Sequence, residues 1–263
     1  MGHLDHASFG WLTPVLSYVM ACIGAALGLR CTVRALGATG RSRRNWLVTA
    51  ASAIGSGIWT MHFVAMLGFG VSGTDVRYDV PLTIVSLLVA MAVVCVGVFA
   101  VGYGKDRARA LFLGGLTTGL GVASMHYLGM AAVRLHGDVT YDPALVGLSV
   151  LIAVVAATAA LWAALNIRSP VAVTIASLIM GAAVTSMHYT AMFAVSVRVT
   201  PSGAVLPGAT AMQFIFPLAV GLGSYLFLTS AFVALSPTSR EREASASAQR
   251  SVESVVPQGA TGP

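Results

Sequence analysis

The sequence predicts an all-α membrane protein with seven transmembrane helices. Three features lead to this prediction: the composition, the length of the apolar stretches and the distribution of basic residues. Of the 263 residues, 57% are hydrophobic and only 9% are charged, whereas a soluble domain carries about 25% charged residues. A chain with so few charges is suited to a lipid bilayer, which is therefore the first partner that we predict.

Seven apolar stretches are separated by charged residues and prolines. Each is close to the roughly 20 residues that a helix needs to cross the hydrocarbon core. Small residues such as Gly24/Gly28 and Gly115/Gly119 recur within them, and in membranes such residues let helix backbones approach closely. The predicted helices cover residues 11–33, 46–69, 81–102, 110–133, 143–165, 170–195 and 212–235.

The net charge of +6 would also suit a nucleic-acid-binding protein, so the placement of the basic residues decides its meaning. Of the 15 Lys and Arg residues, 12 follow the first, third, fifth and seventh predicted helices. By the positive-inside rule, this pattern places the N-terminus outside and the C-terminus in the cytoplasm. We therefore predict a multi-pass protein of the cell inner (plasma) membrane and no nucleic-acid partner. The twelve residues are Arg30, Arg34, Arg41, Arg43, Arg44, Lys105, Arg107, Arg109, Arg168, Arg240, Arg242 and Arg250.

The chain divides into three predicted regions. Residues 1–10 form an extracytoplasmic segment without Lys or Arg, so we expect no cleaved signal peptide and a first helix that remains as an anchor. Residues 11–235 form the seven-helix domain. Residues 236–263 are rich in Ser, Ala and Pro with interspersed charges, a composition typical of a disordered segment, here on the cytoplasmic side.

A threefold internal repeat occupies the second, fourth and sixth predicted helices. The copies read GSGIWTMHFVAM (55–66), GLGVASMHYLGM (119–130) and GAAVTSMHYTAM (181–192). Their Met-His pairs begin at residues 61, 125 and 187, so each period spans two membrane helices with their loops. Helices one to six therefore form three repeated hairpins, and the seventh helix is extra. Because the motif helices run in one direction, all three motifs are expected at one depth, about 10 Å below the outer surface.

The histidines and methionines of the repeat are candidate metal ligands. A His and the Met four residues later lie on one face of a helix, and the Met before each His lies about 100° around from it. Imidazole binds copper, zinc, iron and nickel, whereas thioether sulfur selects chiefly copper. No carboxylate lies within the predicted spans, which disfavours magnesium and calcium. We predict a copper site without catalytic residues. Its predicted ligands are His62, His126, His188, Met61, Met125, Met187, Met66, Met130 and Met192.

Each of these residue types also has an ordinary structural role. A membrane histidine can join neighbouring helices by hydrogen bonds, and methionine fills gaps in apolar cores. Three histidines in register favour a functional site, because ionisable groups within membranes are costly. The aromatic residue after each His is expected to pack, and the hydroxyl before each Met is expected to bond its own helix. These residues are Phe63, Tyr127, Tyr189, Thr60, Ser124 and Ser186.

Ionisable residues also lie outside the predicted helices. His3, His6 and His136 fall in the predicted outer segments, where they are either ordinary loop residues or pass metal inward. Asp79 and Asp142 lie at the outer ends of predicted spans, and we expect them to be solvated or to cap helices.

The three Met-His copies resemble the MHYT family of bacterial integral membrane sensor domains. They read M61-H62-F63-V64, M125-H126-Y127-L128 and M187-H188-Y189-T190, and the third matches the family name letter for letter. The resemblance covers about residues 10–235. It implies a sensor that binds copper through the Met and His of each copy and responds to oxygen, carbon monoxide or nitric oxide. Many family members continue into a cytoplasmic cyclic-di-GMP enzyme; here the residues after Leu235 predict a separate cytoplasmic signalling partner.

Three classes of function are compatible with these residues. The first is a non-enzymatic copper-dependent sensor that responds to a diatomic gas or to redox state. The second is copper acquisition or transfer across the membrane, which would need a continuous ladder of polar or Met side chains. The third is a zinc-dependent membrane enzyme or a haem protein with two imidazole ligands. The only lysine, Lys105, lies in a predicted cytoplasmic loop, which excludes a retinal Schiff base.

Overall fold

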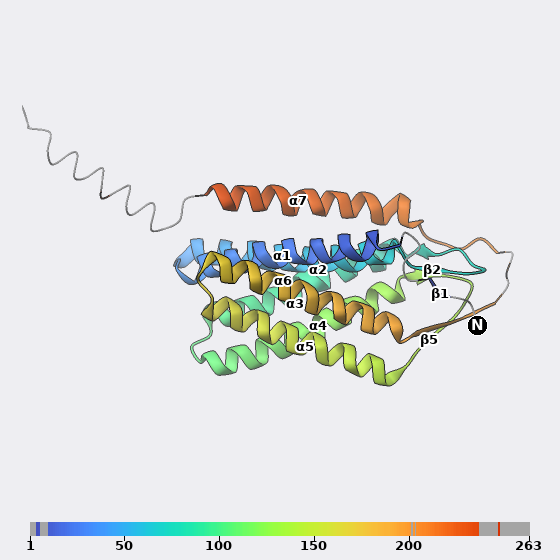
Figure 1. The fold of residues 1–263 in the computed structure, drawn as a ribbon, viewed down its shortest axis with the longest axis horizontal. Helices are drawn as coiled ribbons and strands as arrows, with labels where there is room; N and C mark the ends of the chain where they lie inside the picture. The colour runs from blue at the N-terminus through green and yellow to red at the C-terminus, as the bar shows by residue number, and fades with distance from the viewer. Residues whose placement is uncertain (1–3, 6–9, 201, 203, 237–246, 248–263) are drawn as a thin grey trace, which may run out of the picture.

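Seven long helices run side by side in the computed structural model, which describes residues 4–5, 10–200, 202, 204–236 and 247 (Figure 1). The predicted seven-helix fold is confirmed. The predicted disordered tail lies outside the described residues except at Ser236 and Ser247, as do His3 and His6. The helices are α1 (Leu12–Leu36), α2 (Gly40–Met66), α3 (Val80–Tyr103), α4 (Arg107–Ala131), α5 (Pro143–Asn166), α6 (Pro170–Phe193) and α7 (Phe216–Leu235), the last preceded by a π-helical turn, η1 (Ala211–Ile215).

The lengths and composition of these helices indicate a multi-pass membrane protein. Six of them are long and apolar enough to cross a bilayer. Helix α4 is not among these six, because its glycines, its threonines and His126 lower its mean hydropathy. It nevertheless packs between α3 and α5 within the bundle. Large apolar side chains such as Leu151 and Phe227 are exposed on the outer surface, which suits contact with lipid and not with water.

Prolines and aspartates mark the starts of several helices. Asp79 accepts a hydrogen bond from the backbone N–H of Leu82 at 3.0 Å, and Asp142 accepts one from Ala144 at 2.8 Å. Both aspartates are therefore helix caps, one of the two roles expected for them. The start of α2 differs from the prediction: the helix begins at Gly40 and not near residue 46. Its first turns are rich in arginine, which ends the apolar stretch but does not end the helix.

Helix α2 is the central element of the bundle. Every one of its residues from Gly55 to Met66 is buried, as expected of a helix that is surrounded on all sides. Helices α1 and α3 flank α2, and α1 also packs against α6. Helix α7 packs on the outside, against α1 and α2, and is drawn above them in Figure 1.

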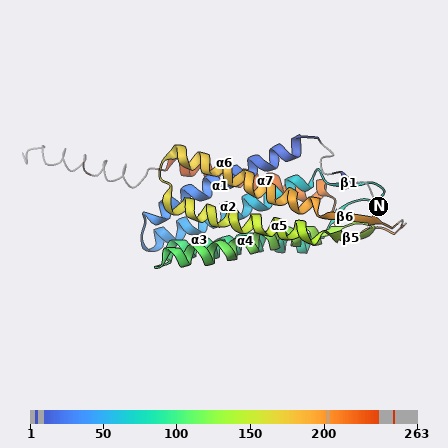
Figure 2. The same cartoon turned by 60° about the horizontal axis from the view of Figure 1, so that its bottom comes forward.

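Short strands of the described residues lie at one end of the bundle, where β1, β5 and β6 are labelled in Figure 2. These strands were not predicted from the sequence. They pair as β1–β2, β3–β4 and β5–β6. The backbones of Tyr78 and Ala209 exchange two further hydrogen bonds of 2.8 and 3.0 Å. The strands are β1 (Leu4–Asp5), β2 (Gly70–Val71), β3 (Arg77–Tyr78), β4 (Val133–Arg134), β5 (Gly137–Tyr141) and β6 (Val195–Val199).

These pairings join the connections that follow the three motif helices into a closed ring. β3–β4 joins the α2–α3 connection to the α4–α5 connection, and β5–β6 joins the latter to the α6–α7 connection. The Tyr78–Ala209 bridge closes the ring. Because each connection thereby satisfies backbone groups of its neighbour, the ring holds the motif-bearing ends of α2, α4 and α6 together.

Close helix contacts form at the small residues, as predicted. A Cβ atom built on Gly24 would lie 2.8 Å from the Cα atom of Gly57, so α1 and α2 touch backbone to backbone there. Glycines of α4 likewise lie against α5: a Cβ on Gly115 would lie 2.9 Å from the Cα of Thr158. Such approach is possible only without side chains, and it sets how closely the helices surround the interior.

We expect Gly57→Ala to destabilise the protein, because the added methyl group meets the α1 backbone. Overpacking of this kind costs about 1–3 kcal/mol. Gly147→Ala on α5 is the matched control, since nothing lies within 4 Å of a Cβ at that position. Thermal unfolding in detergent should show a lower midpoint for Gly57→Ala and an unchanged or slightly higher one for Gly147→Ala. Equal midpoints would contradict the close α1–α2 contact.

Candidate metal centre

The three motif histidines meet in the interior of the bundle. His62 of α2, His126 of α4 and His188 of α6 are all at most 1% exposed. The Nδ1 atom of His62 lies 3.0 Å from Nδ1 of His188 and 3.1 Å from Nδ1 of His126. The predicted convergence of the three histidines is therefore present in the structure, and the three rings form the group capable of holding a metal ion.

The three rings are related by an approximate threefold symmetry. Their centroids are 4.8, 5.0 and 5.1 Å apart, and their planes meet at 75–82°. Each ring also meets the aromatic residue that follows it edge to face, at 4.6 Å for Phe63 and 5.0 Å for Tyr127 and Tyr189. These three aromatic residues have the packing role expected for them. These edge-to-face contacts restrict the orientation of the imidazole rings around the common axis.

Gly129 of α4 makes room for one of the rings. A Cβ atom at this position would lie 2.5 Å from Nε2 of His62 and 3.3 Å from the ring of Phe63. The equivalent residues of the other copies are Ala65 and Ala191, so the repeat keeps a small residue three positions after each His. The close approach of α4 at Gly129 orients the His62 ring so that its Nδ1 atom faces the other two histidines.

The strand-bearing end covers the site. Tyr78 of β3 is 1% exposed, and its hydroxyl donates a hydrogen bond of 3.3 Å to the backbone carbonyl of Met66, one turn beyond His62. Next to it, Arg134 of β4 donates a hydrogen bond of 2.8 Å to Asp79. This bond, together with the Leu82 N–H, holds the pKa of Asp79 below its usual value. The burial of Tyr78 at this end of the bundle was not predicted, because in the sequence it stands in a connection between two predicted helices.

The methionines of the motif are buried without exception. Their exposed fractions are 4% or less, so all six lie inside the bundle, and Met187 also borders a cavity. Ligation by their sulfur atoms stays a prediction, since burial suits a packing role equally well. The six residues are Met61, Met66, Met125, Met130, Met187 and Met192.

Other predicted residues lie apart from the centre or have local roles. His136 lies between β4 and β5, where its Nε2–H donates to the carbonyl of Ala204 at 3.0 Å. Ser124 bonds the Leu120 carbonyl of its own helix at 2.8 Å, as expected. The buried Oγ1 atom of Thr60 has no hydrogen-bond partner in the described part of the chain, so the same expectation does not hold there.

The chemistry of the triad suits a single metal ion. A neutral imidazole carries one N–H and one lone pair. A hydrogen bond between two rings therefore uses two of the three Nδ1 atoms and leaves the third without a partner among them. An ion accepts all three lone pairs together. With metal–nitrogen bonds of about 2.0–2.1 Å, three nitrogens placed evenly around an ion lie about 3.6 Å apart. The two shortest separations here are 3.0 and 3.1 Å, and all three ligand atoms lie within 4.8 Å of one another. Three imidazolium charges in this space would instead repel one another, far from water.

Fold and site together define a multi-pass helical membrane protein with a buried three-histidine centre built by internal repeats. The family model of the MHYT repeat, described as a bacterial signalling protein N terminal repeat, matches residues 55–114 and 119–177. These matches begin at the first glycines of the first and second copies. The chain belongs to the MHYT family.

The chain is also similar to curated signalling proteins. It is 39% identical over 193 residues to the bifunctional diguanylate cyclase/cyclic di-GMP phosphodiesterase MucR of Pseudomonas aeruginosa, covering 72% of this chain and 28% of that protein. It is 35% identical to the cyclic di-GMP phosphodiesterase NbdA of the same species, covering 77% and 26%. It is 29% identical to the signaling protein YkoW of Bacillus subtilis, covering 72% and 24%. The chain thus spans about a quarter of the length of these relatives. No solved structure matches it.

We expect Gly129→Ala to weaken metal binding, because the added methyl group displaces the His62 ring. Changes to residues that orient a ligand typically cost 10–100-fold in metal affinity. Competition between the purified protein and a Cu(I) chelator measures this affinity. Gly147→Ala, where a methyl group meets nothing, should leave it unchanged. An unaltered affinity in Gly129→Ala would show that Gly129 does not position His62.

Proposed function

We propose that this protein is an integral membrane sensor whose His62, His126 and His188 hold a copper ion and which responds to a diatomic gas or to redox state. The observation that carries the proposal is that Nδ1 of His62 lies 3.0 Å from Nδ1 of His188 and 3.1 Å from Nδ1 of His126, with each residue on a different helix. Burying three imidazoles in a membrane protein is costly, and such groups usually serve a function. The positive-inside pattern would place the site near the extracytoplasmic face of the inner membrane.

Copper fits the donor set better than other metals. Nitrogen donors suit several transition metals, and the six buried methionines around the triad would favour copper over zinc. When bound, the ion would supply an open coordination position for a small ligand. The residues of the chain orient the imidazoles, exclude water and link the centre to the helices. We propose no catalytic residue.

A conformational change at the histidine centre would be transmitted through α2 and α7. The three histidines join α2, α4 and α6, so a change in their spacing shifts these helices relative to one another. Ser52 of α2 and Tyr225 of α7 share a hydrogen bond of 2.8 Å. Arg34 of α1 donates bonds of 2.8 and 2.9 Å to the carbonyls of Val233 and Ser236 at the end of α7. Movement of α2 is thereby passed to the far end of α7, which we place in the cytoplasm.

The names of two relatives suggest the class of output. MucR and NbdA are named as enzymes of cyclic di-GMP turnover. We propose that the sensor controls such an activity in a cytoplasmic signalling partner.

Copper transfer and haem binding are less well supported. Directly below the triad, Ile58, Val122 and Val184 offer no ligand for a passing ion, and Met180 in the next layer does not by itself form the continuous ladder that transfer needs. A haem held by two imidazoles would have to lie between the two rings, whereas Nδ1 of His62 and Nδ1 of His188 approach to 3.0 Å. A zinc hydrolase would need a general base near the metal, and none of the helices α1 to α7 carries a carboxylate within its bounds.

Metal analysis by mass spectrometry on detergent-purified protein tests the proposal. We expect copper in the native chain and at least a tenfold loss when His62→Ala, His126→Ala and His188→Ala are combined, because each change removes a nitrogen ligand. His136→Ala is the matched control, since this histidine bonds a loop carbonyl elsewhere, and should retain copper.

Circular dichroism must show that the compared proteins are equally folded. Absence of copper from the native chain after copper loading would contradict the proposal. Zinc at the same histidines would favour an enzyme, and a Soret band would favour haem. Copper accumulation in cells that depends on His126 would favour transport.

A further inference from the structure

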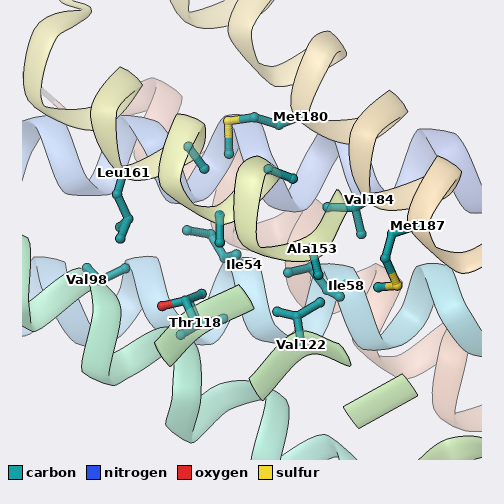
Figure 3. Close-up of a pocket in the computed structure, with 14 residues that line it drawn as sticks. Ile54, Ile58, Val98, Thr118, Val122, Ala153, Leu161, Met180, Val184 and Met187 are labelled. Carbon is teal, nitrogen blue, oxygen red and sulfur yellow. The ribbon is translucent and has the colours of Figure 1, made fainter. Parts of the chain in front are cut away.

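A cavity of about 60 Å³ lies in the interior of the bundle (Figure 3). Met187, which borders it, directly precedes His188. Helices α2 to α6 line the cavity. Thr118 is the one polar side chain among its lining residues, and its hydroxyl points to the Val93 carbonyl at 3.4 Å. The remaining lining side chains are Ile, Val, Leu, Ala and Met. The cavity is therefore apolar.

The repeat positions this cavity directly below the triad. Ile58, Val122 and Val184 line it, and each precedes its motif histidine by four residues. A second layer, Ile54, Thr118 and Met180, precedes the histidines by eight. Residues four apart share one helix face, at a rise of about 6 Å. The cavity thus follows the pseudo-threefold axis for two turns away from His62, His126 and His188.

Size and polarity define the kind of molecule that this space accepts. A cavity needs about 10–15 Å³ to hold one water molecule, and the water needs two to four polar partners. The volume here exceeds that requirement, but a single hydroxyl already directed at a backbone carbonyl cannot supply those partners. Apolar cavities of this kind stay dry and take up xenon or small hydrocarbons. The space is large enough for a small apolar molecule of about two heavy atoms.

The α5 side of the cavity faces the outer surface through small side chains. Ala153, Ala156, Ala157 and Ala160 line it, and the last three are half-buried. The same helix exposes large apolar side chains such as Leu151, as a lipid-facing helix does. An apolar solute is more soluble in hydrocarbon than in water, so the bilayer is its natural source and the alanine side of α5 the shortest way in.

We propose that this cavity is a binding site for an apolar molecule of the diatomic-gas class, taken from the bilayer past the alanines of α5 and held one helical turn below the histidine triad. Binding itself requires no metal, because the cavity is formed by apolar side chains alone. Its role as the place from which gas reaches the centre rests on the proposed function.

Xenon is the probe, and the experiment uses the full chain in lipid nanodiscs with methyl-labelled Ile and Val. Xenon pressure should shift the methyl resonances of Ile54, Ile58 and Val122 in the native protein. Ala157→Leu fills the cavity and should weaken xenon binding at least tenfold. Ala159→Leu is the matched control, because Ala159 is exposed on the same helix, and should bind xenon as the native protein does.

Ala160→Leu serves as a second filled variant and should lose xenon binding in the same way, also if Ala157→Leu fails to fold. Copper content is measured on every sample and should not change. Absence of xenon shifts in the native protein, or native binding by a folded filled variant, would overturn the inference. Xenon binding by a native protein that holds no copper would uphold this inference and count against the proposed function alone.

Discussion

The approach of three imidazole rings along one axis is the constraint on which the rest of the structure depends. Rings whose centroids lie 4.8–5.1 Å apart require α2, α4 and α6 to be close, equally deep and correctly rotated. A shift of one residue along any of these helices would turn its histidine by about 100°. Depth is controlled by the ring of paired connections, and rotation by small residues such as Gly129, which lies against the His62 ring. The packing of the bundle therefore determines the distances between the three histidine rings.

The internal repeat explains why the site is symmetric although the chain is not. Each copy contributes one histidine, one aromatic ring against it and one small residue three positions later. The copies differ where their surroundings differ: α2, which is central, has Trp59 and Phe63 fully buried, whereas α4 and α6 have half-buried tyrosines after their histidines. The helix outside the repeated hairpins, α7, lies beside α1 and α2, where it contacts the most enclosed copy. This placement agrees with the proposed transmission of a conformational change through α7.

The polar centre and the apolar cavity divide the interior into two chemical layers. Three imidazoles face one another at the level of the motif, and the two layers beneath them on the same helix faces consist almost entirely of aliphatic side chains and Met180. The first layer offers three imidazole nitrogens, whereas the layers below offer only the Met180 sulfur and the Thr118 hydroxyl around a cavity. An arrangement in which an ion remains in place and a small neutral molecule comes to it fits a sensor better than a transporter.

The sequence by itself determined the number of helices, their approximate bounds and the level of the three Met-His copies, because hydropathy and repeat period are properties of the chain read in order. It also identified the three histidines as one group, since equal depth follows from equal spacing. Tertiary structure alone decided that the rings meet through Nδ1, that Tyr78 and the strand ring cover them, and that a cavity lies beneath. These features depend on helix rotation and on how closely elements far apart in the chain approach one another. Such distances arise from the packing of many side chains together, and no local pattern encodes them.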